Sequence, residues 1–458
     1  MSKRQGSVDG TAGGRCARRS VLAAAAGLAA VGFRIPAVAA PPNGTHDPAV
    51  LEAAARRAGL RTFVGTRLVL ATDRPPREGD DVDGLPALFA EAVESWRAHF
   101  HLDDRETNGW RAFACLMSDR ETFRAAGLLP TDGSIPDFAH GFCDRNRFWI
   151  DDQSNPAYRR HLLLHEGVHA FTITLRGLAT PTWYTEGIAE FLATHRIERG
   201  RFVPTPIPRR AADVEQLGRI ETLRRLRAAG GVPGLADVLA TPPSPRHEIG
   251  AYAASWAAVA LLALHPDHAE RFAALEAGPL DARLDGRLAS LPGWDADRAG
   301  RDYDAFTDEV DYGFDFARSR IDWSPGRRLD GRTSAPVAAD RGWQPTGVAL
   351  ARGERVEFAG RGRVAVGRAG DVALESTADG ISLRWYRGRP LGRLLLGQWA
   401  GPPEGGRPRF VVVAEGARGR FAAPVDGPLQ AKINAPPGDL ASFSGSLEVH
   451  VRPDRGDG

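Results

Sequence analysis

The feature that most constrains the fold is a change of hydrophobic pattern near residue 330 of the 458-residue chain. Before it, long segments such as 85–102 and 158–175 carry apolar residues at helical spacing. After it, short apolar runs alternate with turn residues at intervals typical of strands, and no long periodic helix interrupts them. One layer architecture does not produce both patterns, so we expect two folded domains.

The first pattern predicts an α+β domain over residues 40–328. Strands are expected at 60–71, 111–117, 142–150 and 312–323, and helices at 85–102, 121–128, 158–175, 186–194 and within 211–308. The second pattern predicts an all-β domain over residues 338–458, a β-sandwich or jelly roll. The polar segment 324–336, which contains Pro and Gly, predicts the linker between them.

The pattern of residues 1–39 indicates a Tat-type export signal, which is not part of the folded protein. Arg18 and Arg19 precede an apolar run, 21–33, that is too short to span a bilayer, and small residues follow at 37–39. Such a signal is an address that a receptor reads, not an anchor. We therefore expect a periplasmic or extracellular protein without a transmembrane anchor. The alternative is a basic tail ahead of a buried helix.

The charge balance argues against a nucleic-acid partner. The chain has 59 basic and 57 acidic residues, a net charge of +2. Residues 1–39 hold six basic side chains and one acidic, so the chain without them carries about −3. Proteins that bind nucleic acid usually present a strong positive field instead.

Two cysteines, Cys115 and Cys143, lie beyond the signal in predicted strands that could be neighbours. Exported proteins form disulfides, so the two could pair. Each could equally be a small buried hydrophobic residue. The sequence leaves both alternatives open.

The chemistry is expected in the segment 165–169, H-E-G-V-H. On a helix, His165 and His169 face the same side one turn apart, so both imidazoles can reach one Zn²⁺. Glu166 beside them is placed to accept a proton from a water that zinc activates. The alternative is a pair of buried helix histidines without a metal.

A third ligand is expected in the segment 183–190, W-Y-T-E-G-I-A-E. HExxH followed by W-x-x-E-G-x-A-E resembles the gluzincin metallopeptidases, in which the Glu of the E-G-x-A-E segment is the third zinc ligand. The resemblance covers about residues 60–320 and implies a zincin-like fold with Glu186 as that ligand. Glu190, one turn further on, could fix a ligand imidazole through a hydrogen bond. The reverse assignment, with Glu190 as the ligand, stays open.

A peptidase also needs a hydrogen-bond donor for the oxyanion of the tetrahedral intermediate. Residues 252–257, Y-A-A-S-W-A, resemble the Y-x-x-S-W segment that follows the zinc motifs in bacterial peptidases of this superfamily. This resemblance implies Tyr252 as the donor, with Tyr184 as a weaker candidate and aromatic packing at a helix start as the alternative. His161 extends the histidines into a stripe and is expected at the helix start without a chemical role. The alternative is that it contacts a metal ligand or faces the substrate.

The segments 343–350, 427–434 and 442–449 resemble the galactose-binding jelly rolls related to the bacterial lectin LecA, over about residues 338–452. In that family, acidic and amide side chains near the final strand bind calcium and sugar. Here A-S-F-S-G at 441–445 takes that place, and Asn434 and Asp439 are the donors that remain. Calcium prefers several carboxylates. We therefore expect a packing or protein-targeting domain, with glycan and Ca²⁺ binding as the alternative.

The whole chain predicts a secreted zinc-dependent peptidase that acts on a peptide or protein substrate. In such enzymes zinc lowers the pKa of its water towards about 7. Glu166 would accept the proton and return it to the leaving amine. The competing class is a non-catalytic surface protein that binds carbohydrate or protein and has a structural zinc site. A structural site would use a fourth Cys or His and needs no Glu166, so the sequence favours the enzyme.

Overall fold

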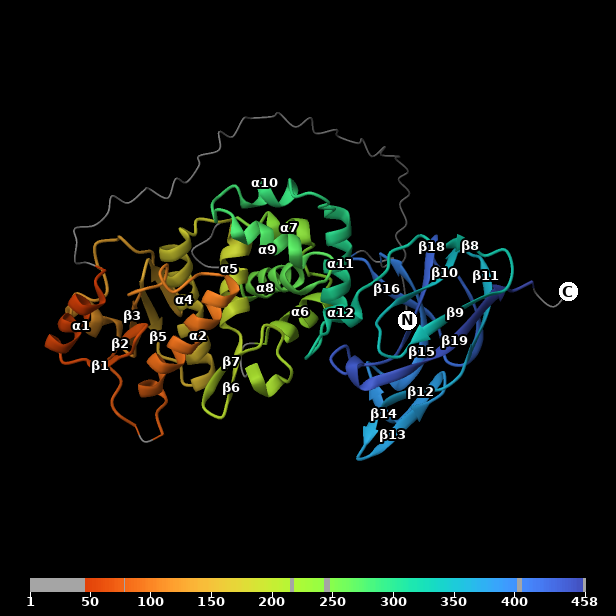
Figure 1. Ribbon diagram of the computed structural model, residues 1–458, viewed down its shortest axis with the longest axis horizontal. Helices are drawn as coiled ribbons and strands as arrows, with labels where there is room; N and C mark the ends of the chain where they lie inside the picture. Colours follow the sequence, from red (N-terminus) through yellow and green to blue (C-terminus); the bar gives the residue numbers. More distant parts are fainter. Residues whose placement is uncertain (1–45, 78, 215–217, 243–247, 402–405, 456–458) are drawn as a thin grey trace, which may run out of the picture. The chain divides into compact units, whose positions relative to one another are not determined.

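The computed structural model describes residues 46–455 except 78, 215–217, 243–247 and 402–405. The predicted export signal lies outside the described residues. The described residues form one compact unit. Within it an α+β part, in which the last helix ends at Ser319, precedes a β-rich part that begins with a strand at Arg327 (Figure 1).

The α+β part opens with a five-stranded sheet and its helices. The elements are α1 (Pro48–Arg57), β1 (Arg61–Val64), β2 (Leu68–Thr72), the 3₁₀ helix η1 (Val82–Gly84), α2 (Leu85–His99), β3 (Ala112–Met117), α3 (Arg120–Ala125), β4 (Gly141–Asp144), β5 (Arg147–Asp151) and α4 (Pro156–Arg176). The strand order is β1-β2-β3-β5-β4, with β2, β3 and β5 parallel and the two outer strands antiparallel. Every residue of β2 and β3 is buried, because both faces of the sheet are covered.

The two faces of this sheet contribute to two separate hydrophobic cores. Leu70 and Phe148 point into the core that α2 and α4 share. Their strand neighbours Val69 and Trp149 point into the smaller core that contains residues of α1 and α3. The alternation follows from the two-residue period of a strand.

The two cysteines do not pair; both thiols are free. Cys115 lies on β3 and Cys143 on β4, and β5 runs between these strands. Cys115 belongs to the smaller core, whereas Cys143 packs against the core on the opposite face. Of the two alternatives that the sequence left open, the structure shows two small buried or half-buried side chains.

Helices dominate the rest of the α+β part. The elements are α5 (Thr182–Ala193), β6 (His195–Glu198), β7 (Arg201–Pro204), η2 (Ala211–Val214), α6 (Arg219–Ala228), α7 (Leu235–Leu239), α8 (Ile249–Leu264), α9 (Ala269–Ala277), α10 (Leu284–Ala289), α11 (Ala296–Glu309) and α12 (Phe316–Ser319). The apolar helix α8 packs against α5 and lies inside the part (Figure 1). Among the described helices none alone has the length and apolarity to span a membrane, and α8 with α9 would do so only as a pair bent by 103°.

Three strand predictions differ from the structure. Residues 60–71 form two strands, and 142–150 form the hairpin β4–β5, in which Arg145 adopts a φ of 55°. The strand predicted at 312–323 is wrong, because this segment contains the short helix α12. The side chain of Asp315 caps α12 by accepting a hydrogen bond from the backbone N–H of Arg318.

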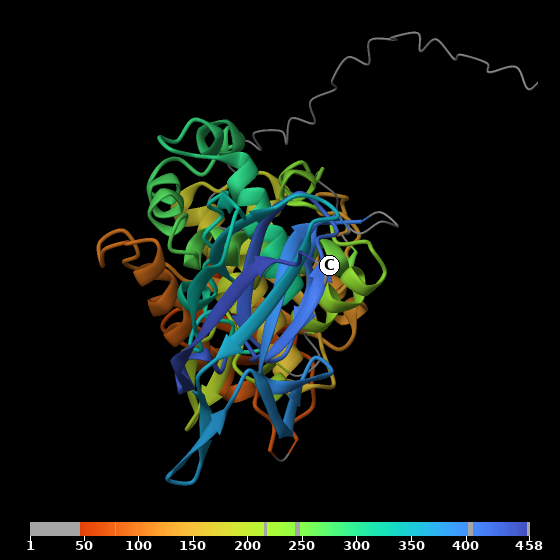
Figure 2. The same ribbon diagram turned by 90° about the vertical axis from the view of Figure 1, so that its right-hand side faces the viewer.

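The β-rich part consists of two six-stranded sheets. In Figure 2 this part lies nearest the viewer. One has the order β14-β15-β18-β10-β8 with β16 beside β15, and the other β13-β12-β19-β11-β17 with β9 beside β19. Both sheets contribute to one hydrophobic core. The elements are β8 (Arg327–Arg328), β9 (Thr333–Ala338), β10 (Gln344–Leu350), β11 (Arg355–Arg361), β12 (Val364–Ala369), β13 (Val372–Ser376), β14 (Asp379–Tyr386), β15 (Arg389–Ala400), β16 (Arg409–Glu415), β17 (Arg418–Ala422), β18 (Gly427–Ile433), η3 (Leu440–Ser442) and β19 (Phe443–Pro453).

A glycine sets the distance between α4 and α2. A Cβ atom on Gly167 would lie 2.3 Å from the ring of Phe89 and 3.0 Å from that of Trp96. We expect Gly167→Ala to lower the free energy of unfolding by about 1–3 kcal/mol, because the buried rings must move. Thermal and denaturant unfolding measure this.

Gly300 on α11 provides the matched control. No atom would lie within 4 Å of its Cβ. Gly300→Ala should therefore stabilise the protein by about 0.5–1 kcal/mol through helix propensity. Equal effects of the two substitutions would contradict the tight packing of α4 on α2.

Candidate metal centre

Helix α4 carries the H-E-G-V-H segment, and its two ends are fixed by local interactions. The side chain of Asn155 accepts hydrogen bonds from the first backbone N–H groups, and Pro156 occupies the first turn. Gly177 ends the helix in the left-handed conformation, with a φ of 63°. The helix therefore holds His165 and His169 on one face in its buried middle.

Three predicted ligands converge from two helices. His165 Nε2 lies 3.2 Å from His169 Nε2 and 3.3 Å from Glu186 Oε2, a residue of α5. His169 Nε2 lies 3.7 Å from the same carboxylate oxygen. Ligand atoms about 2.0–2.1 Å from a tetrahedral zinc stand about 3.3 Å apart, so the three donors fit this ion.

Glu190 contacts the same histidine at its other ring nitrogen. Its carboxylate lies 3.3 Å from His165 Nδ1, within ion-pair distance but not aligned as a hydrogen bond. It also lies 3.2 Å from His161 Nε2 and accepts two hydrogen bonds from the guanidinium of Arg219, one of them 2.8 Å long. A carboxylate held by a guanidinium is a poor metal ligand. The geometry therefore favours Glu186 as the ligand and Glu190 as the residue that orients His165.

The charges of the centre are strongly coupled. Burial alone would lower the pKa of His165, but the carboxylates of Glu186 and Glu190 outweigh it and raise this pKa to about 10. Burial opposes ionisation of Glu186 as well, yet the two histidines hold its pKa well below its ordinary value. Burial raises the pKa of Glu166, partly offset by His165 and His169. Glu166 is thus shifted towards the range that suits a general base near neutral pH.

Glu166 lies against the edge strand of the sheet. A Cβ atom on Gly141 would stand 2.4 Å from Glu166 Oε1, so β4 passes directly over the carboxylate. β4 is the last strand in the sheet order, and it pairs with β5 on one side. The sequence contained no signal for Gly141, because its role depends on contact between a strand and a helix.

Tyr252 lies near the metal centre, and Tyr184 is turned away from it. The ring of Tyr252 is 6.0 Å from that of His165, and the guanidinium of Arg219 stands 5.5 Å over it. Burial, followed by the nearby glutamates, raises the pKa of Tyr252, which keeps its hydroxyl protonated. The buried Tyr184 donates its hydroxyl hydrogen to Glu276 at 2.8 Å.

Two basic side chains have a closer relation to the centre than the sequence indicated. His161, expected at the helix start without a role, is buried beside Glu190. Arg219 was not predicted at all. It lies 29 residues beyond Glu190 on another helix, and its spacing carries no motif.

Two more groups of potential metal donors are present: His161, His165 and Glu190 form one that shares His165 with the first, and His265, His268 and Asp302 form a separate one. Asp302 contacts His268 Nε2 at 2.9 Å, and it accepts hydrogen bonds from Trp323 at 2.7 Å and Arg298 at 3.1 Å. These donors already satisfy both carboxylate oxygens. The group is therefore better described as a hydrogen-bonded network than as a metal site.

No family model matches the chain, and no curated protein matches it. Among solved structures, an aminopeptidase N family protein from Idiomarina loihiensis is similar over 86% of this chain and 69% of its own, with 12% identity and a TM-score of 0.34. A structure described as the EclA N-terminal domain, a PllA-like lectin, covers 28% of this chain and 98% of its own, with 20% identity and a TM-score of 0.20. Both TM-scores are below 0.5, so neither structure assigns the chain to a family.

The charge state of His165 predicts how zinc affinity depends on pH. Its pKa of about 10 in the metal-free site lies above the ordinary value for histidine, so the imidazole holds a proton that zinc must displace. The apparent affinity should rise about tenfold per pH unit between about pH 6.5 and 9. Competition with a chelator of known pH dependence measures it. His450→Gln, on β19 of the β-rich part, should leave the slope unchanged, and a pH-independent affinity in the wild type would contradict the assignment.

Proposed function

We propose that the chain is a zinc-dependent peptidase in which His165, His169 and Glu186 hold the metal. The observation that carries the proposal is the convergence of these three donors at 3.2–3.7 Å, next to Glu166 on the same helix turn. The sequence-based export signal further suggests that it acts outside the cytoplasm.

Zinc at this site would act as a Lewis acid and make water a nucleophile near neutral pH. Glu166 accepts a proton from the attacking water at a carboxylate oxygen and passes it to the leaving amine nitrogen. Burial raises its pKa, which makes the carboxylate a better proton acceptor than that of an exposed glutamate. Tyr252, with its protonated hydroxyl, is the candidate donor to the oxyanion.

The position of β4 supports a peptide substrate over other hydrolysable bonds. β4 is an edge strand whose Gly141 packs against Glu166, and among the described residues no strand pairs with its outer side. An extended peptide can add to such an edge through main-chain hydrogen bonds. This arrangement would bring a backbone carbonyl of the peptide close to Glu166.

The main alternative is a non-catalytic protein with a structural zinc site. Such a site would use a fourth Cys or His ligand. Among the described residues, the group of potential metal donors formed by His165, His169 and Glu186 contains no cysteine and no third histidine. Cys143 donates its thiol hydrogen to the carbonyl of Arg145 at 3.2 Å. These observations favour the enzyme.

The variant Glu166→Gln tests the proposed base. It should bind zinc as the wild type does, because Glu166 is not a proposed ligand, and should lose about 10²–10⁴-fold in turnover. The assay is cleavage of a peptide library with free and acetylated N-termini, together with metal analysis. His169→Ala should lose both zinc and activity. Wild-type turnover in Glu166→Gln would exclude the proposed mechanism.

For the β-rich part we propose a packing role and not sugar or calcium binding. The amide nitrogen of Asn434 donates hydrogen bonds to the carbonyls of Tyr386, Arg389 and Pro390 at 3.0–3.1 Å. Asn434 thus secures a turn of its own domain. Burial raises the pKa of Asp439, so its environment disfavours the ionised form that calcium requires.

Isothermal titration of the wild type with galactosides tests this role. We expect no binding heat at millimolar sugar, with or without millimolar calcium, because the region lacks several carboxylate ligands. A LecA-type lectin serves as the positive control. Calcium-dependent heat that disappears in Asp439→Asn would establish the lectin alternative instead.

A further inference from the structure

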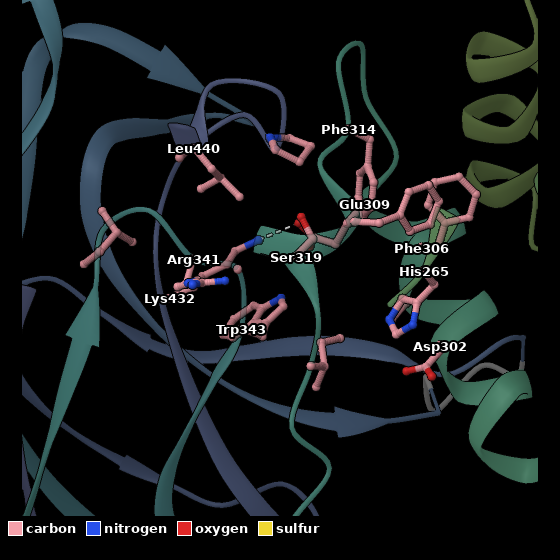
Figure 3. Close-up of a pocket in the computed structure, with 17 residues that line it drawn as sticks. His265, Asp302, Phe306, Glu309, Phe314, Ser319, Arg341, Trp343, Lys432 and Leu440 are labelled. Atoms are coloured by element: carbon pink, nitrogen blue, oxygen red, sulfur yellow. Dashed lines mark hydrogen bonds and ion pairs between the residues drawn. The ribbon is translucent and has the colours of Figure 1, made fainter. Parts of the chain in front are cut away.

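The α+β part and the β-rich part share a built interface. Trp343 and Phe410 of the β-rich part stack at 4.4 Å in a hydrophobic cluster that also contains Ala305 of α11. Beside it, Lys432 forms an ion pair of 2.6 Å with Glu309, and its ammonium lies 4.7 Å from the Trp343 ring (Figure 3). The adjoining cavity measures about 40 Å³. An interface with its own hydrophobic cluster and buried ion pair resembles a domain interior more than a flexible junction.

The segment 304–312 receives contacts from the β-rich part on one side. Arg407 binds the carboxylate of Asp304 through two hydrogen bonds of 2.9 and 3.0 Å. The hydroxyl of Tyr386 donates to Asp311 at 3.1 Å. A Cβ atom on Gly438 would stand 2.3 Å from the carbonyl oxygen of Tyr312, so the two backbones touch there. The β-rich part thus holds the segment at several points.

Helix α6 contacts the same segment from the other side. Arg227 pairs with Asp308 at 2.6 Å and also donates to the carbonyl of Pro408 in the β-rich part at 2.9 Å. Arg224 pairs with Asp311, and Glu221 accepts a hydrogen bond from the hydroxyl of Tyr312. Asp311 therefore joins α6 to Tyr386 of the β-rich part.

The first residue of α6 is Arg219, which holds Glu190 at the metal centre. Glu190 is 1% exposed and contacts Nδ1 of the proposed ligand His165. One short helix thus connects the interface to a ligand imidazole. A guanidinium fork binds both carboxylate oxygens at once, which fixes the plane of the carboxylate as well as its position.

We propose that Arg219 is a positioning residue for the metal centre and that the β-rich part secures it through Asp311 and α6. The inference rests on the proposed function, because it assumes that His165 holds zinc. Without this anchor Glu190 loses its fixed plane, and His165 gains freedom that zinc binding must remove. The β-rich part then contributes to metal affinity without touching the metal.

The test measures zinc affinity by chelator competition, a readout that does not depend on turnover. Arg219→Gln should weaken affinity about 10–100-fold, the range found when residues that orient metal ligands are replaced. Arg219→Lys keeps the positive charge but lacks the planar guanidinium that binds both carboxylate oxygens. Its zinc affinity should lie between those of Arg219→Gln and the wild type. The visible spectrum of the Co²⁺ form should change in both variants, since the ligand geometry changes. Thermal unfolding of each metal-free variant separates loss of folding from loss of affinity.

Two interface variants test the anchor. Asp311→Asn and Tyr386→Phe should each weaken zinc affinity by about 2- to 30-fold. Arg452→Gln is the control, because it removes an exposed pair with Glu357 inside the β-rich part and should leave affinity unchanged. If α6 connects the interface at Asp311 to the proposed metal centre, Asp311→Asn should lower zinc affinity less in an Arg219→Lys background than in the wild type.

The outcomes separate this inference from the proposed function. A wild-type protein that binds no zinc overturns both. A wild-type protein that binds zinc, with unchanged affinity in the Arg219 variants, overturns the inference alone. Additive effects of Arg219→Lys and Asp311→Asn would also overturn the proposed anchor.

Discussion

The close packing of three carboxylates, two of them buried, beside two imidazoles is the constraint on which the candidate metal centre depends. Glu166 and Glu190 are almost fully buried, and Glu186 lies beside them. An unpaired buried charge costs several kcal/mol, so each carboxylate requires a partner or a proton. Arg219 is the partner of Glu190, and the raised pKa of Glu166 eases its protonation. Glu186 and the paired histidine nitrogens together present the charge and geometry that a divalent cation satisfies.

Around this cluster, neighbouring elements also pack so closely that some positions have no room for a Cβ atom. Glycines stand at three such contacts: Gly167 between α4 and α2, Gly141 between β4 and Glu166, and Gly187 between α5 and α8. At Gly187 a Cβ atom would lie 2.5 Å from the carbonyl oxygen of Ser255, one turn beyond Tyr252. The glycine within the E-G-x-A-E segment therefore lets α8 bring Tyr252 towards the metal centre. The segment that supplies the proposed ligand Glu186 thus also contains the glycine that allows close packing of α5 on α8.

Short-range sequence patterns predicted those residues of the candidate metal centre that lie together on one helix, α4. The four-residue spacing placed His165 and His169 on one face of α4, since helical period alone determines this. Arg219 could not be predicted, because its contact with Glu190 depends on the packing of separate helices. Aromatic residues at every second position, Tyr312, Phe314 and Phe316, match the two-residue period of a strand, although no strand forms there. In the structure Phe314 and Phe316 pack on Phe306, with ring centroids 4.9 and 4.7 Å away, so tertiary packing overrides the local period.

The change of hydrophobic pattern near residue 330 marks a change of secondary structure, yet the folded unit continues across it. The unit is continuous because polar side chains of the β-rich part contact the α+β part. Tyr386, Lys432 and their neighbours could have formed an exposed binding edge, but here they contact acidic residues of the segment 304–312. The buried pair of Lys432 and Glu309 adds little net stability by itself, because desolvation opposes the attraction. Its directional contacts instead favour one orientation of the two parts, and the proposed link from the interface through α6 to the candidate metal centre depends on that orientation.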